Sequence, residues 1–255
     1  MTKQRQTAQH VLLLDAGDAL NGEEGLGLAT KGKLMVEAMN LLGYQAMALG
    51  SGDFVIGLDT LRIRMKAAQF PMLSANAVFS DTGQLVGQPY VIDDLGQGHK
   101  AAIIGLTDPD VLGFLEAMNE PAVRVLDATE TVRRYVQEVS GQADIIIVLS
   151  HMGLDFDQEV AKAVPGIDVI IGGKSGAVLN PANRVSPTGP VIAQAGSQGK
   201  YLGVLRLKFD GQGNLLGVEG GPVSLGSDIP DDPAMADLIE RYSKQLGPTP
   251  RPVAE

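Results

Sequence analysis

The chain has 255 residues, of which 44% are apolar, and it carries a formal net charge of −10. It contains no cysteine, which excludes disulfides, thiolate catalysis and cysteine-bound zinc. Its Lys and Arg residues are scattered rather than gathered in a basic stripe, so we expect no nucleic-acid partner. No stretch approaches the roughly 20 apolar residues of a membrane helix, and the apolar run at 11–14 is too short for a signal peptide. We therefore expect no membrane partner and a cytoplasmic protein, or an exported one if an upstream segment is missing.

Apolar periodicity predicts alternating strands and helices in the first part of the chain. Residues 11–14 form a continuous apolar run typical of a buried strand, which turn residues end at 15–18. A Gly-rich loop at 21–32 precedes an amphipathic helix at 33–42, which Gly43 ends. The next predicted elements are a strand at 45–49, a turn at 50–52, a helix at 58–69 and a strand at 72–74.

The rest of the chain mixes hairpins with further strand–helix units. The predicted elements are a hairpin at 90–106, helices at 128–140 and 156–164, strands at 144–149 and 169–171, and strands at 190–195, 202–209 and 215–225 with a hairpin turn at 210–214. A helix at 234–246 and a linker-like tail at 247–255 end the chain. We expect one domain at 1–230, followed by this helix and tail at 231–255. The pattern predicts an α/β (α+β) fold of two packed mixed sheets with helices outside, although it also allows a plain doubly wound fold.

Small and polar residues follow several predicted strands, where ligands of α/β proteins bind. These motifs are Asp15–Asp18, Gly50–Asp53, Ser150-His151 and Gly172–Gly176. Together with residues 70–76 and 193–197, they resemble the metallophosphoesterase domain of the 5'-nucleotidase/UDP-sugar hydrolase family, over roughly residues 11–246. The resemblance implies a four-layer α/β/β/α sandwich and a two-metal phosphohydrolase site.

Three residues match carboxylate or histidine positions of that site. Asp18 matches the bridging aspartate, and His151 matches the ligand of the family's Ser-His motif. Asp53 matches the acidic residue that orients the family's catalytic histidine, but without that histidine the sequence favours a loop carboxylate that bonds backbone amides. We take Asp18, Asp53 and His151 as the residual metal-ligand candidates.

Other positions of the implied site are occupied by different residues. Ser51 and Gly52 stand where the family has an asparagine and its catalytic histidine, and Lys174 and Gly176 replace the two histidines of Gly-His-Ser-His. Lys174 either places an ammonium where a metal cation lies in the family or points into solvent. The Asp-x-His motif of the family's first strand is absent, as is the C-terminal nucleotide-binding domain. We assign Ser51, Gly52, Lys174 and Gly176 to the rim of a vestigial site and expect no catalytic residue.

The sequence therefore favours a degenerate metallophosphoesterase domain, a pseudoenzyme with no expected cofactor, which acts as a binding or interaction module. The alternative is an active phosphoester or nucleotide hydrolase. It would use a single divalent metal (Mn, Zn or Co) at Asp18, Asp53 and His151, or a site completed by another chain. A truncated gene product without selected activity is the third possibility.

The absent first strand would leave the edge of residues 11–14 unpaired, which is a template for strand pairing. We expect residues 1–9, a loop or another protomer to close this edge, so a homo-oligomer or a protein partner is expected there. The sequence does not identify a small-molecule ligand.

Overall fold

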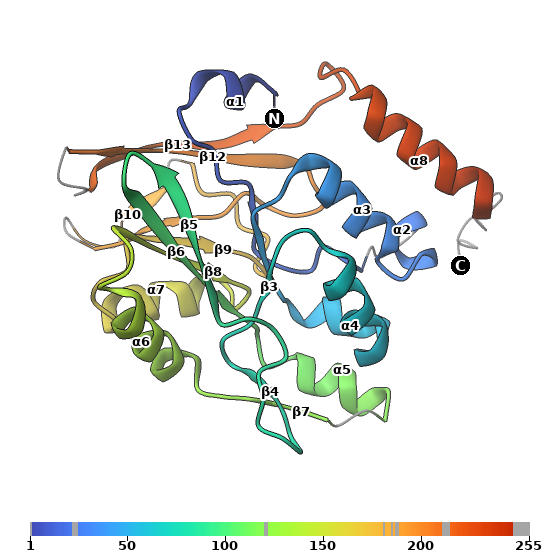
Figure 1. The fold of residues 1–255 in the computed structure, drawn as a ribbon, viewed down its shortest axis with the longest axis horizontal. Helices are drawn as coiled ribbons and strands as arrows, with labels where there is room; N and C mark the ends of the chain where they lie inside the picture. Colours follow the sequence, from blue (N-terminus) through green and yellow to red (C-terminus); the bar gives the residue numbers. More distant parts are fainter. Residues whose placement is uncertain are drawn as a thin grey trace.

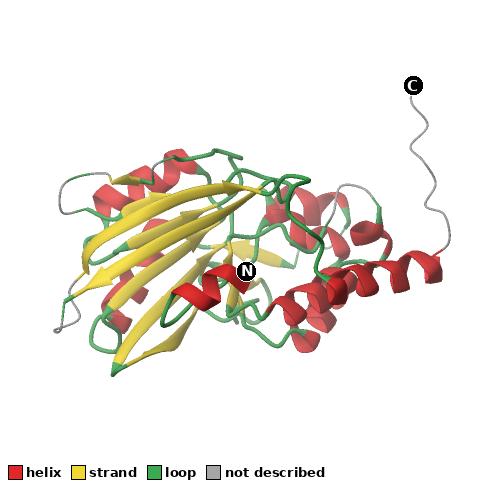
Figure 2. Ribbon diagram, turned by 90° about the horizontal axis from the view of Figure 1, so that it is seen from above, coloured by secondary structure: helices red, strands yellow, loops and turns green. Residues whose placement is uncertain are grey.

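The structure is a computed structural model that describes residues 2–21, 25–119, 122–180, 182–184, 186, 189–210 and 215–246 (Figure 1). Two groups of strands pack face to face, and helices lie on the outer surfaces of both groups, although part of the second outer surface is left open (Figures 1 and 2). The expected four-layer α/β/β/α arrangement is confirmed.

A six-stranded sheet forms the first β layer, with the strand order β10-β11-β9-β8-β6-β5. Its strands are β5 (Tyr90–Gly96), β6 (His99–Leu106), β8 (Ile145–Ser150), β9 (Val169–Gly172), β10 (Asn183–Arg184) and β11 (Val191–Ala193). The inner four are parallel, while β5 and β10 run antiparallel to their neighbours at the two edges. All six residues of β8 are buried, because both faces of the sheet are covered.

Helices α6 (Ala128–Val139) and α7 (Leu154–Ala163) cover one face of this sheet. In α6 the buried residues Val132, Tyr135, Val136 and Val139 recur at helical spacing, so they form one apolar stripe against the sheet. The Asp127 side chain accepts a 2.8 Å hydrogen bond from the Glu130 amide and caps the helix.

The second β layer consists of two separate sheets. Strands β1 (Leu14–Asp15), β2 (Ala46–Ala48) and β3 (Met72–Leu73) are parallel, and β12 (Tyr201–Phe209) pairs antiparallel with β13 (Leu215–Ser224). Both sheets contribute apolar residues to the layer that faces β6 and β8. Gly105 permits the close approach, because a Cβ there would lie 2.3 Å from the Leu73 Cβ.

Helices α3 (Lys33–Leu42) and α4 (Leu58–Ala67), with the 3₁₀ helix η1 (Ser51–Ile56), cover the outer face of the β1-β2-β3 sheet. Helix α8 (Pro233–Leu246) packs on α3 through Leu238 and Tyr242, which contact Leu34. The Tyr242 hydroxyl donates a 2.6 Å hydrogen bond to Glu37. None of the helices in the described part of the chain has the length and apolarity needed to cross a bilayer.

Several elements differ from the sequence-based expectations. The strand expected at 11–14 is only Leu14–Asp15, because pairing with β2 is confined to those two residues. The loop expected at 21–32 contains the short helix α2 (Leu26–Ala29). The unpredicted elements are α1 (Thr2–Thr7), α5 (Val111–Ala117), β10, and the β4 (Ala77–Phe79) and β7 (Val123–Val125) pair. The expected turn at 211–214 and the tail at 247–255 lie outside the described residues.

Helix α1 lies near the edge that was expected to need a cover. Arg5 donates hydrogen bonds to the carbonyls of Leu42 and Gly43 at the end of α3, and Arg206 of β12 donates one to Gln4. Val11 and Leu12, which follow this helix, form no backbone hydrogen bond with another described residue.

Candidate functional site

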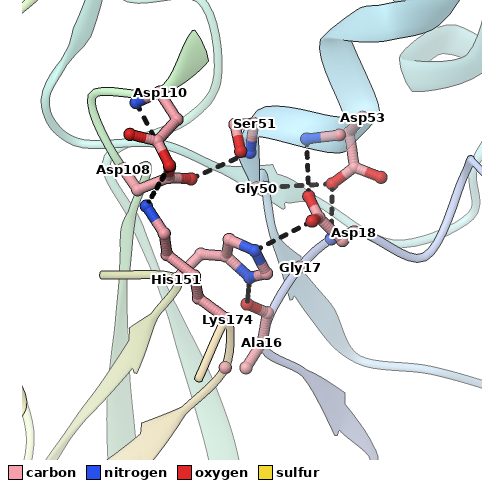
Figure 3. Close-up of polar contacts among 12 residues, drawn as sticks. Ala16, Gly17, Asp18, Gly50, Ser51, Asp53, Asp108, Asp110, His151 and Lys174 are labelled. Carbon is pink, nitrogen blue, oxygen red and sulfur yellow. Dashed lines mark hydrogen bonds and ion pairs between the residues drawn. The ribbon is translucent and has the colours of Figure 1, made fainter. Parts of the chain in front are cut away.

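The carboxyl ends of β1, β2, β6, β8 and β9 meet at one edge of the two β layers (Figure 3). The side chains gathered there are Asp18, Ser51, Asp53, Asp108, Asp110, His151 and Lys174. The structure thus brings together Asp18, Ser51, His151 and Lys174, whose convergence the sequence predicts.

Asp53 is fully buried and binds the backbone of the surrounding loops. Its Oδ1 accepts a 2.8 Å hydrogen bond from the Leu20 amide, and its Oδ2 accepts 2.9 Å bonds from the amides of Asp18 and Gly50. Burial raises the pKa of Asp53 to about 7, although these amides oppose the increase. Both oxygens are therefore engaged in holding the loops after β1 and β2 together.

Asp18 and His151 form an ion pair, with 3.0 Å between Asp18 Oδ2 and His151 Nε2. The contact lacks hydrogen-bond alignment, whereas His151 Nδ1 makes a 2.7 Å hydrogen bond to the Ala16 carbonyl. Burial disfavours the charged imidazole, but Asp18 outweighs it and raises the pKa of His151 to about 8. Burial would likewise raise the pKa of Asp18, but His151 and the Gly52 amide lower it below its usual value.

Glycines at three strand ends enclose the His151 ring. A Cβ at Gly17, Gly50 or Gly173 would lie 2.7 to 2.8 Å from a ring atom. The Gly52 amide, in turn, donates a 2.7 Å hydrogen bond to Asp18 Oδ1, and a Cβ at Gly52 would lie 2.9 to 3.0 Å from the Asp18 carboxylate. The present positions of Asp18 and His151 thus depend on residues without side chains.

Lys174 points toward the loop after β6 and not away into solvent. Its Nζ lies 2.7 Å from Asp108 Oδ1 and 2.6 Å from Asp110 Oδ2. Asp108 Oδ2 accepts a 3.0 Å hydrogen bond from the amide of Ser51, which is itself buried. Gly176 lies farther along the loop after β9, where a Cβ would come within 3.8 Å of only the Ser197 hydroxyl.

Three acidic residues at this edge were not identified from the sequence. Asp108 and Asp110 follow the predicted strand that ends at Leu106, so the rule that ligands gather at strand ends would have found them. Asp157 lies in the first turn of α7, where an acidic residue is usually solvated. It is instead 1% exposed, and neither oxygen has a hydrogen-bond partner among the described residues. Burial raises its pKa to about 7, opposed by the Ser150 hydroxyl and the charge of His151.

Comparisons with known proteins agree with the fold and with the positions of these motifs. No family model matches the chain. Human 5'-nucleotidase is 33% identical over 280 residues, which cover 96% of this chain and 47% of the relative. A snake venom 5'-nucleotidase from Gloydius brevicauda is 33% identical over 266 residues, which cover 95% of this chain and 44% of the relative. The chain matches the metallophosphoesterase domain of the 5'-nucleotidase family. It spans about half the length of the curated relatives it matches.

Solved structures of the family and of related phosphoesterases share this architecture. The 5'-nucleotidase precursor from Thermus thermophilus has a TM-score of 0.82 and 30% identity, covering 96% of this chain and 51% of that one. The calcineurin-like phosphoesterase YfkN from Bacillus subtilis has a TM-score of 0.83 and 26% identity, covering 96% of this chain and 86% of that one. The matched region thus includes nearly all of the chain.

The described side chains do not fit the two-metal centre that the family resemblance implies. Such a centre needs several carboxylate and imidazole donors directed at two ions. Here Asp18 and His151 pair with each other, Asp53 binds three amides, and an ammonium lies between Asp108 and Asp110. Within the described ranges, no group of three or more His, Cys, Asp or Glu residues is placed to hold a metal ion.

Proposed function

We propose that this chain is a degenerate metallophosphoesterase domain without conventional two-metal phosphohydrolase activity, which serves as a binding or interaction module. The observation that carries the proposal is the ammonium of Lys174 between Asp108 and Asp110, at an edge where the family has metal donors. An ammonium supplies positive charge, but it neither lowers the pKa of a bound water nor clamps attacking and leaving oxygens as two metal ions do.

One observation favours the alternative of a one-metal hydrolase. His151 is oriented by the Ala16 carbonyl so that Nε2 faces Asp18, and a ring nitrogen bonded to a backbone carbonyl is typical of metal-bound histidines. Asp53, the third residue of that alternative, has both oxygens bonded to amides. A single ion would therefore find two protein donors and would depend on water for the rest of its coordination.

A hydrolase assay with a matched variant tests the proposal. The purified chain is incubated with Mn²⁺, Zn²⁺ or Co²⁺ and with AMP, UDP-glucose, bis(p-nitrophenyl) phosphate or p-nitrophenyl phosphate. We expect no metal-dependent turnover and equal residual rates in an Asp18→Asn/His151→Ala double variant prepared identically. Metal-dependent turnover that disappears in the double variant would overturn the proposal and establish the one-metal hydrolase.

We place the interaction surface at the edge formed by residues 11–14, with a second copy of the chain as the occupant. Val11 and Leu12 have no backbone partner among the described residues, and an unpaired apolar edge accepts a further strand. Light scattering over a range of concentrations is expected to show a dimer that a Leu12→Lys substitution dissociates. A protein that is monomeric at every concentration would contradict this assignment.

A further inference from the structure

The Asp108 carboxylate is buried at the end of β6, where two backbone amides and one ammonium contact it. Its side chain is 0% exposed. Oδ2 accepts the 3.0 Å hydrogen bond from the Ser51 amide, while Oδ1 accepts a 3.2 Å bond from the Asp110 amide and lies 2.7 Å from Lys174 Nζ. A buried carboxylate without a cation is strongly disfavoured, because neither hydration nor a counter-charge compensates it. Lys174 is the one cation within ion-pair distance of it among the described residues.

Lys174 reaches this position from a different strand end. It lies two residues beyond β9, in a left-handed backbone conformation with a φ of 64°. Its side chain is 31% exposed, so the ammonium lies between the buried carboxylate of Asp108 and the solvent-facing one of Asp110 (Figure 3). Burial disfavours the charged ammonium, but the carboxylates of Asp108 and Asp110 together outweigh it and raise the pKa of Lys174, so the side chain stays charged.

The resulting network joins loops that follow three strands. Asp108 and Asp110 follow β6, Ser51 follows β2, and Lys174 follows β9. These strands belong to both β layers, so the contact connects the two sheets at the edge where they converge. A bound divalent ion commonly has this same role, since it neutralises several carboxylates from different loops.

We propose that Lys174 is a tethered cation that replaces a metal ion in holding this edge together. The inference rests on the proposed function, because it supposes that the native chain holds no divalent ion there. It has two consequences: the stability of the native protein is independent of metal, and removal of the ammonium leaves Asp108 and Asp110 as a site for a divalent cation.

Thermal unfolding of two Lys174 variants, with EDTA or with Mn²⁺, tests these consequences. Lys174→Met removes the charge and keeps most of the apolar stem, whereas Lys174→Arg keeps the charge. We expect the wild type and Lys174→Arg to melt at the same temperature in EDTA and in Mn²⁺. We expect Lys174→Met to melt about 4 °C or more lower in EDTA and to recover part of that loss in Mn²⁺. Adding Asp110→Asn should abolish the recovery, because it removes one of the two carboxylates.

A neutralised triple variant keeps the inference testable if Lys174→Met does not fold. Asp108→Asn/Asp110→Asn/Lys174→Met removes both carboxylates along with the ammonium, and replacing all partners of a buried ion pair is far better tolerated than removing one. We expect this variant to fold and to melt at the same temperature with EDTA and with Mn²⁺. Its failure to fold would overturn the inference.

Two further results would overturn it: a Lys174→Met variant as stable as the wild type, or one that Mn²⁺ does not stabilise. Failure of the proposed function is detected by a different experiment, the hydrolase assay, in which the wild type would show metal-dependent turnover. That result does not depend on the melting temperatures of the Lys174 variants.

Discussion

Asp18 Oδ2 lies 3.0 Å from His151 Nε2, and the opposite nitrogen of the same ring bonds the Ala16 carbonyl at 2.7 Å. The imidazole is thus fixed between a carboxylate and a backbone acceptor, and both favour its protonated form. The charge of Asp18 accordingly has a direct and measurable effect on the titration of His151.

We expect the pKa of His151, measured by NMR, to be near 8 in the wild type and below the ordinary ~6.5 in an Asp18→Asn variant. Without the carboxylate, burial is the largest remaining effect and disfavours the charged ring, although the Ala16 carbonyl and the charge of Asp108 oppose it. The other two histidines, His10 and His99, serve as internal references because they pair with Asp93 and Asp144 instead. An unchanged His151 titration in the variant would refute this assignment.

The same pair gives the protein a pH-dependent contribution to stability. Since the folded-state pKa of His151 is raised, its contribution is fully present below about pH 6.5 and is lost as the pH rises through about 8. The loss should be about 2 kcal/mol in urea unfolding experiments on the wild type and should be absent in Asp18→Asn. If the free energy of unfolding depended on pH in the same way in both proteins, this prediction would be contradicted.

Replacement of the unpartnered Asp157 by asparagine should stabilise the protein at neutral and alkaline pH. The folded-state pKa of Asp157 is raised to about 7, so its ionisation reduces stability progressively as the pH rises from its unfolded value through 7. From pH 5.5 to 8.5, the advantage of Asp157→Asn over the wild type should grow by about 2 kcal/mol. The matched control is Asp155→Asn, which removes an exposed acid from the same helical turn and so accounts for the loss of one negative charge there.

Removal of the Asp53 carboxylate should destabilise the fold substantially. Asp53→Ala leaves the amides of Asp18, Leu20 and Gly50 without their acceptor, and each buried unsatisfied group costs about 1–3 kcal/mol. We expect a loss of more than about 2 kcal/mol in urea unfolding. Asp59→Ala, at a position whose side chain is 94% exposed, should change stability by less than about 0.5 kcal/mol. Similar losses in the two variants would argue against Asp53 as a structural carboxylate.

Helix α8 should contribute to stability through its inward face alone. Leu238 is 7% exposed and packs against Leu34, whereas the adjacent Ile239 is 44% exposed. Leu238→Ala should cost about 2 kcal/mol or more, and Ile239→Ala less than about 1 kcal/mol. Equal costs would mean that α8 is not held on α3 in solution.

The sequence predicts the longer helices and strands and misses the short elements, for reasons visible at particular residues. Helix α3 begins and ends at the predicted residues, since Gly43 ends it in a left-handed conformation with a φ of 69°. By contrast, the apolar run at 11–14 contains only the start of β1, because a strand is defined by its partner and β2 pairs only with Leu14 and Asp15. Strands β4 and β7 have three residues each, which is too short for a periodic pattern.

Family motifs locate the candidate site but not its internal contacts. The motifs identify Asp18, His151 and Lys174, yet they do not include Asp108, so the motifs alone do not predict the partner of Lys174. Asp157 was missed because its burial depends on a distant glycine. A Cβ at Gly172 would lie 2.3 Å from Asp157 Oδ2, so the missing side chain of Gly172 makes room for the carboxylate.

The contact between Gly52 and Asp18 bears on the evolutionary reversibility of the site. Any side chain at position 52 requires the Asp18 carboxylate to shift, because even a Cβ would lie 2.9 to 3.0 Å from its atoms. That shift would disturb the hydrogen bond from the Gly52 amide and the ion pair with His151, so position 52 is coupled to both contacts of Asp18. A histidine at position 52 is therefore compatible with Asp18 only after the carboxylate moves, and the present Asp18–His151 contact is tied to the absence of a side chain at Gly52.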